Sequence, residues 1–264
     1  MTTGTLDTLG LARLSRGTYN THQTGTPPHG TSTVENRVTA LLGFLKQTPL
    51  FAGIADAELA VLARDFVPKR FPQGQTILHQ GDAGQTLYLI QSGSVRIYVM
   101  DETGQETSVT LSGPGDIFGE LALIDDLPRS ASAVAMLDTV VLTLGREMFR
   151  EHLRRSPQLA LNFLKALSIR VRHSTQQVGS LTFLDVPARL ARKLLELAQD
   201  HGVAEPDGVR IDTVLTQTDL ASLIGATRES INKALGALRR QGLVETRQGR
   251  ILIVDADALR ELGS

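Results

Sequence analysis

The first 47 residues divide into a polar segment and a predicted amphipathic helix. Apolar residues recur at helical spacing over residues 34–47, and a shorter helix is expected over residues 56–64. Residues 1–33 contain ten Thr and five Gly with few apolar side chains. This composition is typical of a flexible tail.

From Phe66 to Leu144 the hydrophobic pattern changes to short alternating segments separated by glycines. Many short strands at roughly 8–12-residue spacing are typical of an antiparallel sandwich or barrel. A stretch of this length predicts a small antiparallel roll with room for one small ligand. The clearest strand segments are Thr86–Ile90, Ser94–Val99, Ser108–Leu111 and Val140–Leu144.

Pro157 opens a long predicted helix that extends to about Phe183. Its apolar residues alternate spacings of four and three, the heptad pattern of a two-stranded coiled coil. The pattern favours a homodimer, and packing of the helix on its own barrel is the alternative. Ser174, followed by Thr175, is the polar residue in this seam, and it either fixes the register or contacts a ligand. The other seam residues are Ala160, Leu164, Leu167, Val171, Val178 and Leu181.

Residues 217–238 predict two short helices joined at Gly225, whose backbone freedom suits a tight turn. Thr227 can cap the second helix. Arg can bond bidentately to guanine, and Glu can accept a hydrogen bond from cytosine, so a helix that opens with both suits a major groove. An ordinary helical hairpin with a solvated face is the alternative. The residues expected to point outward are Arg228, Glu229, Asn232 and Lys233.

A two-stranded hairpin is predicted next, formed by Leu243–Thr246 and Arg250–Val254, as in a winged helix-turn-helix. Upstream, Asp185–Pro187 ends the long helix, and another helix follows from residue 187 to about residue 199. The whole chain has a net charge of −1, but residues 228–250 contain six Lys or Arg against two Glu. On a recognition helix and wing, this surplus favours contact with DNA phosphates over a merely solvated face.

The segment Gly115–Ala131 (GDIFGELALIDDLPRSA) carries the candidate ligand site. Gly119 allows the backbone to approach a ligand, and Glu120 adds a carboxylate. Arg129 and Ser130 supply a guanidinium and a hydroxyl, which together with Glu120 suit a ligand that has a phosphate and a sugar. A surface Glu–Arg ion pair is the alternative.

Several classes of protein are excluded by what the chain lacks. It contains no cysteine, which removes disulfides, thiolate zinc sites and cysteine-ligated iron–sulfur clusters. No apolar run approaches the ~20 residues of a membrane span, and no signal sequence is recognisable, which predicts a soluble cytoplasmic protein. No nucleophile–base pair, metal cluster or phosphate-cradling loop occurs, so we expect neither an enzyme nor a metal site.

In combination, the motifs resemble the catabolite activator (cyclic-AMP receptor) branch of the family that includes the fumarate–nitrate regulators. The similarity covers about residues 40 to 255 in the family's order. The segments that carry it are Gly81-Asp82, Leu87-Tyr88, Gly93-Ser94-Val95, Phe118-Gly119-Glu120-Leu121-Ala122, Arg129-Ser130-Ala131, Val178-Gly179-Ser180-Leu181, Phe183-Leu184-Asp185-Val186 and Ala226-Thr227-Arg228-Glu229-Ser230.

The resemblance implies a cyclic-AMP site and a role for each of its residues. Gly119 and Glu120 would hold the ribose, and Arg129 with Ser130 would bind the cyclic phosphate. Ser174 and Thr175 match a Thr-Ser pair that reaches the adenine from the dimer helices, but here the order is reversed. The implied nucleotide-binding set is Gly119, Glu120, Leu121, Arg129, Ser130, Ser174 and Thr175.

The resemblance also implies a homodimer on double-stranded DNA with TGTGA-like half-sites. Arg228 and Glu229 match the principal base-reading positions, and Lys233 stands where the best-known members have Arg. Residues 199–208 occupy the place of a loop that contacts RNA polymerase, an implied further partner. The implied DNA-binding set is Thr227, Arg228, Glu229, Ser230, Asn232 and Lys233.

The sequence therefore predicts an α+β protein with four parts. These are a flexible tail (1–33), a jelly-roll-like cyclic-nucleotide-binding β-roll domain (34–156), a dimerisation helix and hinge (157–186) and a winged helix-turn-helix DNA-binding domain (187–264). We predict a cyclic-AMP-responsive transcriptional regulator. The alternatives are a regulator of the same fold with no effector or another one, haem included, and a cyclic-nucleotide regulatory subunit of an enzyme.

Overall fold

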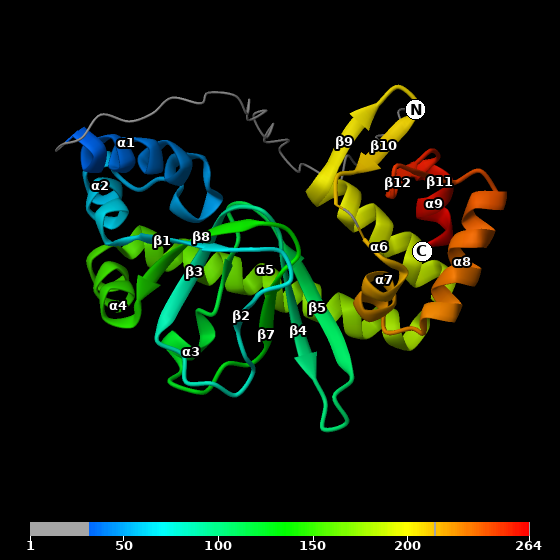
Figure 1. Cartoon of the computed structure of the whole chain (residues 1–264), viewed down its shortest axis with the longest axis horizontal. Coiled ribbons are helices and arrows are strands. Elements are labelled where there is room, and N and C mark those ends of the chain that lie inside the picture. The colour runs from blue at the N-terminus through cyan, green and yellow to red at the C-terminus, as the bar shows by residue number, and fades with distance from the viewer. Residues whose placement is uncertain (1–31, 214, 264) are drawn as a thin grey trace, which may run out of the picture.

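The computed structural model describes residues 32–213 and 215–263 (Figure 1). An N-terminal β-roll and a C-terminal domain are joined by one long helix, α5 (Pro157–Phe183). In Figure 1 the roll lies to the left and the C-terminal domain to the right. The predicted tail lies outside the described residues except at positions 32 and 33, where helix α1 already begins.

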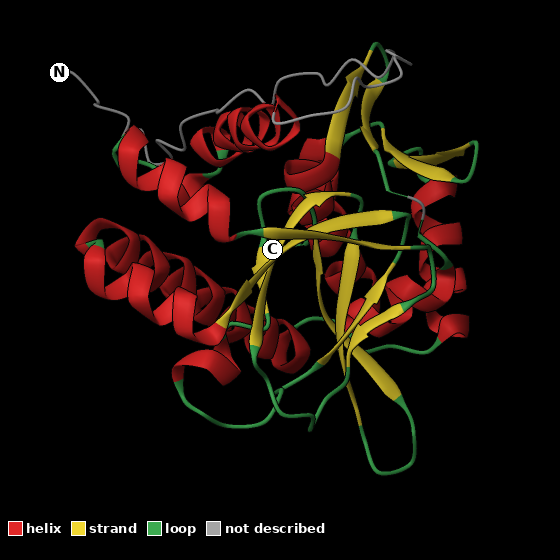
Figure 2. Cartoon of the chain, turned by 60° about the vertical axis from the view of Figure 1, so that its left-hand side comes forward, coloured by secondary structure: helices red, strands yellow, loops and turns green. Residues whose placement is uncertain are grey.

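The roll is built from two four-stranded antiparallel sheets, visible as yellow strands in Figure 2. One has the order β1-β8-β3-β6 and the other β2-β7-β4-β5. Ile90, Val95, Phe118, Ala133 and Val141 form a small apolar cluster within the roll. The strands are β1 (Val67–Phe71), β2 (Thr76–Leu78), β3 (Thr86–Ser92), β4 (Val95–Met100), β5 (Glu106–Ser112), β6 (Ile117–Phe118), β7 (Ser132–Ala135) and β8 (Thr139–Gly145).

Helices cover the first of these sheets and enclose the main core of the roll. Leu45, Leu59, Phe149 and Phe163, each from a different helix, pack there against Leu89 and other side chains of the sheet. The first turns of α5 belong to this core, so the long helix is anchored on its own roll. The remaining helices of this part are α1 (Ser32–Gln47), the 3-10 turn η1 (Pro49–Phe51), α2 (Asp56–Asp65), α3 (Leu121–Ile124) and α4 (Arg146–Arg155).

The C-terminal domain has its own core and its own sheet, of order β11-β12-β10-β9. Leu190, Leu194, Leu220 and Ile231 are among its fully buried side chains. Its elements are α6 (Val186–His201), β9 (Gly202–Glu205), β10 (Gly208–Ile211), α7 (Gln217–Ile224), α8 (Arg228–Arg240), β11 (Val244–Arg247), β12 (Arg250–Ile253) and α9 (Ala256–Leu262).

Helix α7 rests against the edge strand β5 of the roll (Figure 1). The hydroxyl of Ser222 accepts a hydrogen bond from the Ser108 amide at 2.7 Å and donates one to the Glu106 carbonyl at 3.3 Å. Unpaired groups of an edge strand need partners. Here a side chain of the C-terminal domain supplies them.

The predicted α+β architecture of β-roll, long helix and winged helix-turn-helix is confirmed. Strands β9 and β10 form a hairpin that turns between Glu205 and Gly208, and the sequence did not predict these two strands. Helices α3, α4 and α9 were not predicted from the sequence.

Candidate functional site

Gly119 and Glu120 lie between strand β6 and helix α3. Gly119 has φ +77°, a conformation that favours glycine. Glu120 is only 1% exposed, and one of its oxygens pairs with the guanidinium of Arg170 on α5. The other oxygen, Oε2, is buried with no hydrogen-bond partner among the described residues. A buried oxygen without a donor is the kind of atom that a ligand hydroxyl satisfies.

Arg129 lies beside this pair and is 6% exposed. It donates to the carbonyls of Gly119 and Thr86, the latter at 2.8 Å, and its guanidinium carbon lies 5.7 Å from the centre of the Tyr88 ring. No carboxylate lies within ion-pair distance of Arg129 in the described part of the chain. Burial lowers the pKa of Arg129, and the nearby Tyr88 and Glu120 oppose that shift. A buried guanidinium with no carboxylate in direct contact is a site for an anion.

Two glycines allow Arg129 to sit this close to the backbone. A Cβ on Gly84 would lie 2.9 Å from Cζ of Arg129 and 2.4 Å from Cβ of Ala122. A Cβ on Gly119 would lie 2.7 Å from Nη1 of Arg129. The segments that carry Gly84 and Gly119 therefore form a tight cradle for the guanidinium.

The other predicted nucleotide-site residues lie on exposed surface near this cradle or on α5. Ser130 follows Arg129 and is exposed, and Leu121 opens α3 with an exposed side chain. Ser174 and Thr175 are exposed on α5, one turn beyond Arg170, and the Thr175 hydroxyl donates to the Val171 carbonyl at 3.0 Å. The structure thus brings Gly119, Glu120 and Arg129 together.

Arg170 contacts the candidate site, and it was not among the residues predicted from the sequence. Besides the pair with Glu120, it donates to the Ile117 carbonyl at 2.9 Å. It stands four residues before Ser174, so both lie on the same face of the helix. The four-residue spacing from Ser174 could therefore have indicated from the sequence that Arg170 faces the candidate site.

The two short helices meet at Gly225, which has φ +62° and ends α7. Thr216 and Asp219 form a capping box at the start of α7, and Thr227 caps α8 by accepting a hydrogen bond from the Ser230 amide. The inner face of α8 is buried in the domain core. The outer face leaves Thr227, Arg228, Glu229, Asn232 and Lys233 exposed and Ser230 half-buried.

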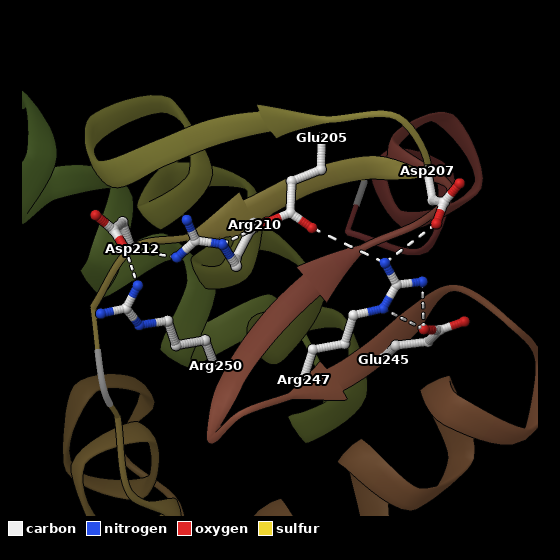
Figure 3. A network of polar contacts seen from close by, with 7 residues as sticks. All are labelled: Glu205, Asp207, Arg210, Asp212, Glu245, Arg247 and Arg250. Carbon is white, nitrogen blue, oxygen red and sulfur yellow. Dashed lines mark hydrogen bonds and ion pairs between the residues drawn. The ribbon is translucent and has the colours of Figure 1, made fainter. Parts of the chain in front are cut away.

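The cations of the wing have carboxylate partners within the domain (Figure 3). Arg247 pairs with Asp207 at 3.1 Å and with Glu245 at 2.9 Å, and Arg250 pairs with Asp212. The pKa of Arg247 is raised, first by its hydrogen bond with Glu245. The charge surplus that the sequence placed on the wing is therefore partly neutralised by carboxylates of the same domain.

No cluster of three or more metal-ligating side chains occurs among residues 32–213 and 215–263. Nor does any described helix combine the length and apolar character needed to span a membrane.

Comparison with known proteins agrees with this two-part architecture. Residues 68–156 match the cyclic nucleotide-binding domain family, and residues 188–262 match the Crp-like helix-turn-helix domain family. A CRP-like cAMP-activated global transcriptional regulator of Mycobacterium tuberculosis is 34% identical over 215 residues, which cover 81% of this chain and 96% of the relative.

Two proteins of Thermus thermophilus are also similar. Its cyclic AMP receptor protein is 37% identical over 218 residues, which are 83% of this chain and 98% of that protein. The crystal structure of one of its CRP-family transcriptional regulators has a TM-score of 0.62 at 30% identity, with coverage of 74% of this chain and 96% of the other. The chain therefore belongs to the CRP/FNR family of transcriptional regulators, in which a cyclic-nucleotide-binding domain is joined to a helix-turn-helix domain.

Proposed function

We propose that this chain is a cyclic-AMP-responsive regulator that binds pseudo-palindromic DNA as a homodimer. The names of its relatives favour cyclic AMP as the effector and gene regulation as the output. The observation that carries the proposal is the buried Arg129, which has no carboxylate partner among the described residues and lies beside a buried Glu120 with one unpaired oxygen.

Each group of a cyclic nucleotide would have a partner in this cradle. The cyclic phosphate would neutralise Arg129 and accept a hydrogen bond from the Ser130 hydroxyl. The ribose 2′-hydroxyl would donate to the free oxygen of Glu120. Leu121 would line the ribose side. This arrangement would give Arg129 an anion in direct contact and Glu120 a hydrogen-bond donor, which the described residues do not supply.

The purine would lie toward α5, where Ser174 and Thr175 offer hydroxyls. The reversed order of these residues relative to the family pattern bears on the choice between adenine and guanine. We therefore include cyclic GMP in every binding test.

The exposed seam of α5 supports a homodimer. Beyond its anchored first turns, the helix leaves Leu164, Val171, Val178 and Leu181 uncovered, and Val178 is 64% exposed. Regulators of this family bind DNA as dimers. A parallel pair of α5 helices would bury these side chains and would bring both nucleotide sites next to the interface.

The exposed start of α8 is the proposed reading surface. Arg228 would bond to a guanine and Glu229 to a cytosine in the major groove of a TGTGA-like half-site. Lys233 would reach a guanine or a phosphate as a point charge. Thr227, Ser230 and Asn232 would add contacts at the same end of the helix.

Arg170 supplies a path from nucleotide to dimer. A ligand shifts a conformational equilibrium only if it binds one arrangement better than the other. Because Arg170 pairs with Glu120, a nucleotide that engages Glu120 changes the environment of α5 directly. The arrangement so favoured would set the two α8 helices about 34 Å apart, one turn of DNA.

Contact with RNA polymerase through residues 199–208 is part of the same proposal.

Calorimetric titration with cyclic AMP and cyclic GMP tests the pocket. The wild-type chain, Arg129→Leu and the control Arg154→Leu would be compared, since Arg154 is an exposed arginine whose ion pair with Glu151 lies within α4. We expect loss of cyclic-AMP binding in Arg129→Leu alone, with helical content retained by circular dichroism. Equal affinity in all three proteins would refute the assignment of Arg129.

A further inference from the structure

Helix α4 lies beside the cradle that surrounds the Arg129 guanidinium, and it contributes two arginines that point toward this cradle. Arg146 is its first residue and Arg150 lies one turn later. The guanidinium of Arg146 donates to the Gly84 carbonyl at 2.6 Å and to the Ala122 carbonyl at 2.8 Å. Arg150 donates through Nε to the Leu123 carbonyl at 3.1 Å. All three acceptors belong to the two segments that enclose Arg129.

Both arginines also converge on one carboxylate. Arg150 Nη2 bonds both oxygens of Asp126, at 2.8 and 2.9 Å, and Arg146 pairs with the same side chain. Asp126 has φ +62°, a conformation that only a few non-glycine residues adopt. The two arginines lower the pKa of Asp126, chiefly through the hydrogen bond with Arg150. Asp126 thus fixes the end of α3 to the start of α4.

The segments held in this way are those that position the ligand groups. The first is residues 81–86, which pairs with Arg129 through Gly81 N to Arg129 O at 2.9 Å and Arg129 N to Asp82 O at 2.8 Å. The second is residues 119–129, which we call the nucleotide loop, and it carries Glu120 and Arg129. The hydrogen bonds and ion pairs from Arg146 and Arg150 help to hold residues 122–126 against the rest of the roll. Without α4 these interactions would be absent.

We propose that Arg146, Arg150 and Asp126 form a clamp whose role is to hold the nucleotide loop in its binding geometry before a ligand arrives. The three residues are positioning residues, because they fix the loop that carries Glu120 and Arg129 and act on the ligand through it. The clamp rests on the proposed function only for the identity of the ligand. Its effect on the loop is a property of the free protein.

The clamp also has a place in the coupling of the two parts. Helix α4 runs directly into α5 at Ser156, and Ser156 bonds Glu58 of α2 at 2.9 Å. The loop is therefore fastened at one end to α5 by Glu120–Arg170 and at the other to α4 by Asp126. A ligand that moves the nucleotide loop would therefore act on α5 through Glu120–Arg170 and on α4 through Asp126.

Three substitutions separate positioning from a general loss of stability. Asp126→Asn removes the charge but keeps a residue that tolerates a left-handed backbone. Arg150→Gln removes the guanidinium, and Arg150→Lys keeps the charge without the planar fork that spans Leu123 and both oxygens of Asp126. Arg154→Gln is the matched control, an arginine on the same helix whose ion pair stays within α4.

Amide hydrogen exchange of the full-length protein without ligand is the deciding measurement. We expect faster exchange in residues 119–129 of Asp126→Asn and Arg150→Gln, with an intermediate rate in Arg150→Lys. Strands β4 and β5 should keep their protection, and Arg154→Gln should match the wild type. Unchanged exchange in the loop, or equal acceleration throughout the roll, would overturn the clamp.

Cyclic-AMP affinity gives the second readout. If the clamp variants order the loop in only a tenth of the molecules, the apparent Kd rises about tenfold. Asp126→Asn and Arg150→Gln should not be additive when combined, because both break the same pair. An unchanged Kd in these variants, measured against a wild type that binds, would overturn the clamp. A wild type that binds no cyclic nucleotide would refute the proposed ligand instead, and loop exchange alone would then decide the clamp.

Discussion

Gly119→Ala tests whether Arg129 depends on the close approach of the backbone. Gly119 has φ +77°, and a Cβ there would lie 2.7 Å from Nη1 of Arg129, 3.2 Å from Cδ2 of Tyr88 and 3.3 Å from the Thr86 carbonyl oxygen. The guanidinium of Arg129 must move, because a Cβ cannot stay 2.7 Å from Nη1, and the contacts with Tyr88 and Thr86 are already tight. Gly74→Ala is the matched control, since Gly74 has φ +81° and nothing lies within 4 Å of its added Cβ.

The two substitutions share one cost and differ in another. A left-handed backbone costs an alanine about 1–2 kcal/mol, so both variants should lose that much free energy of unfolding. Only Gly119→Ala also displaces Arg129. Loss of one charge-assisted hydrogen bond to a phosphate is about 1.5–3 kcal/mol. At about 1.4 kcal/mol per factor of ten, cyclic-AMP affinity should fall about ten- to hundredfold.

Urea unfolding and calorimetric titration measure the two quantities separately. We expect Gly74→Ala to lose stability while it retains the wild-type Kd, and Gly119→Ala to lose both stability and affinity. Equal nucleotide affinity in the two variants would refute the steric reasoning.

Three further predictions concern other residues of the chain. Arg228→Ala should cost about 1–3 kcal/mol on the specific duplex and much less on random DNA, as measured by titration of both; equal losses would make Arg228 a phosphate contact. Val178→Asp places a carboxylate in the exposed seam of α5 and should shift sedimentation toward the monomer without unfolding; an unchanged dimer would contradict the predicted interface. The pKa of Asp126 should lie below its usual 3.8, because Arg150 and Arg146 stabilise the carboxylate. Their pairing is thus fully present above pH 3.8 and is lost as pH falls through the lowered pKa, and a carboxyl titration by NMR at or above 3.8 would contradict it.

The sequence predicted the elements in which a regular apolar spacing continues over many residues, and those that are bounded by a glycine turn. Helix α5 matches its predicted bounds, and Gly225 has the left-handed conformation that the turn requires. Helix α4 was missed because its sequence (REMFREHLRR) is almost entirely polar, with only a few apolar side chains to mark an inner face. The arginines of α4 bond the nucleotide loop, so tertiary contacts contribute more to this helix than a hydrophobic pattern in its sequence does.

The proximity of the candidate site residues was predictable where these residues are close in sequence. Gly119, Glu120 and Arg129 come from one segment and do meet. Arg170 could not be placed, because its partner Glu120 lies 50 residues away and a charged residue on a long helix resembles a solvated position. In the wing, too, ion-pair partners that lie far apart in the sequence could not be predicted. Arg247 and Arg250 read as free cations, whereas their partners Asp207 and Asp212 come from the preceding hairpin.

Nucleotide-controlled DNA binding is the central claim, and fluorescence anisotropy on a palindromic TGTGA-N6-TCACA duplex tests it most directly. The titration would be run at one fixed salt concentration, because phosphate contacts make affinity strongly salt-dependent. We predict tight binding with cyclic AMP and only weak, sequence-independent binding without it. Tight binding that is the same with and without cyclic AMP would contradict the switch, and absence of specific binding in both conditions would contradict the predicted operator.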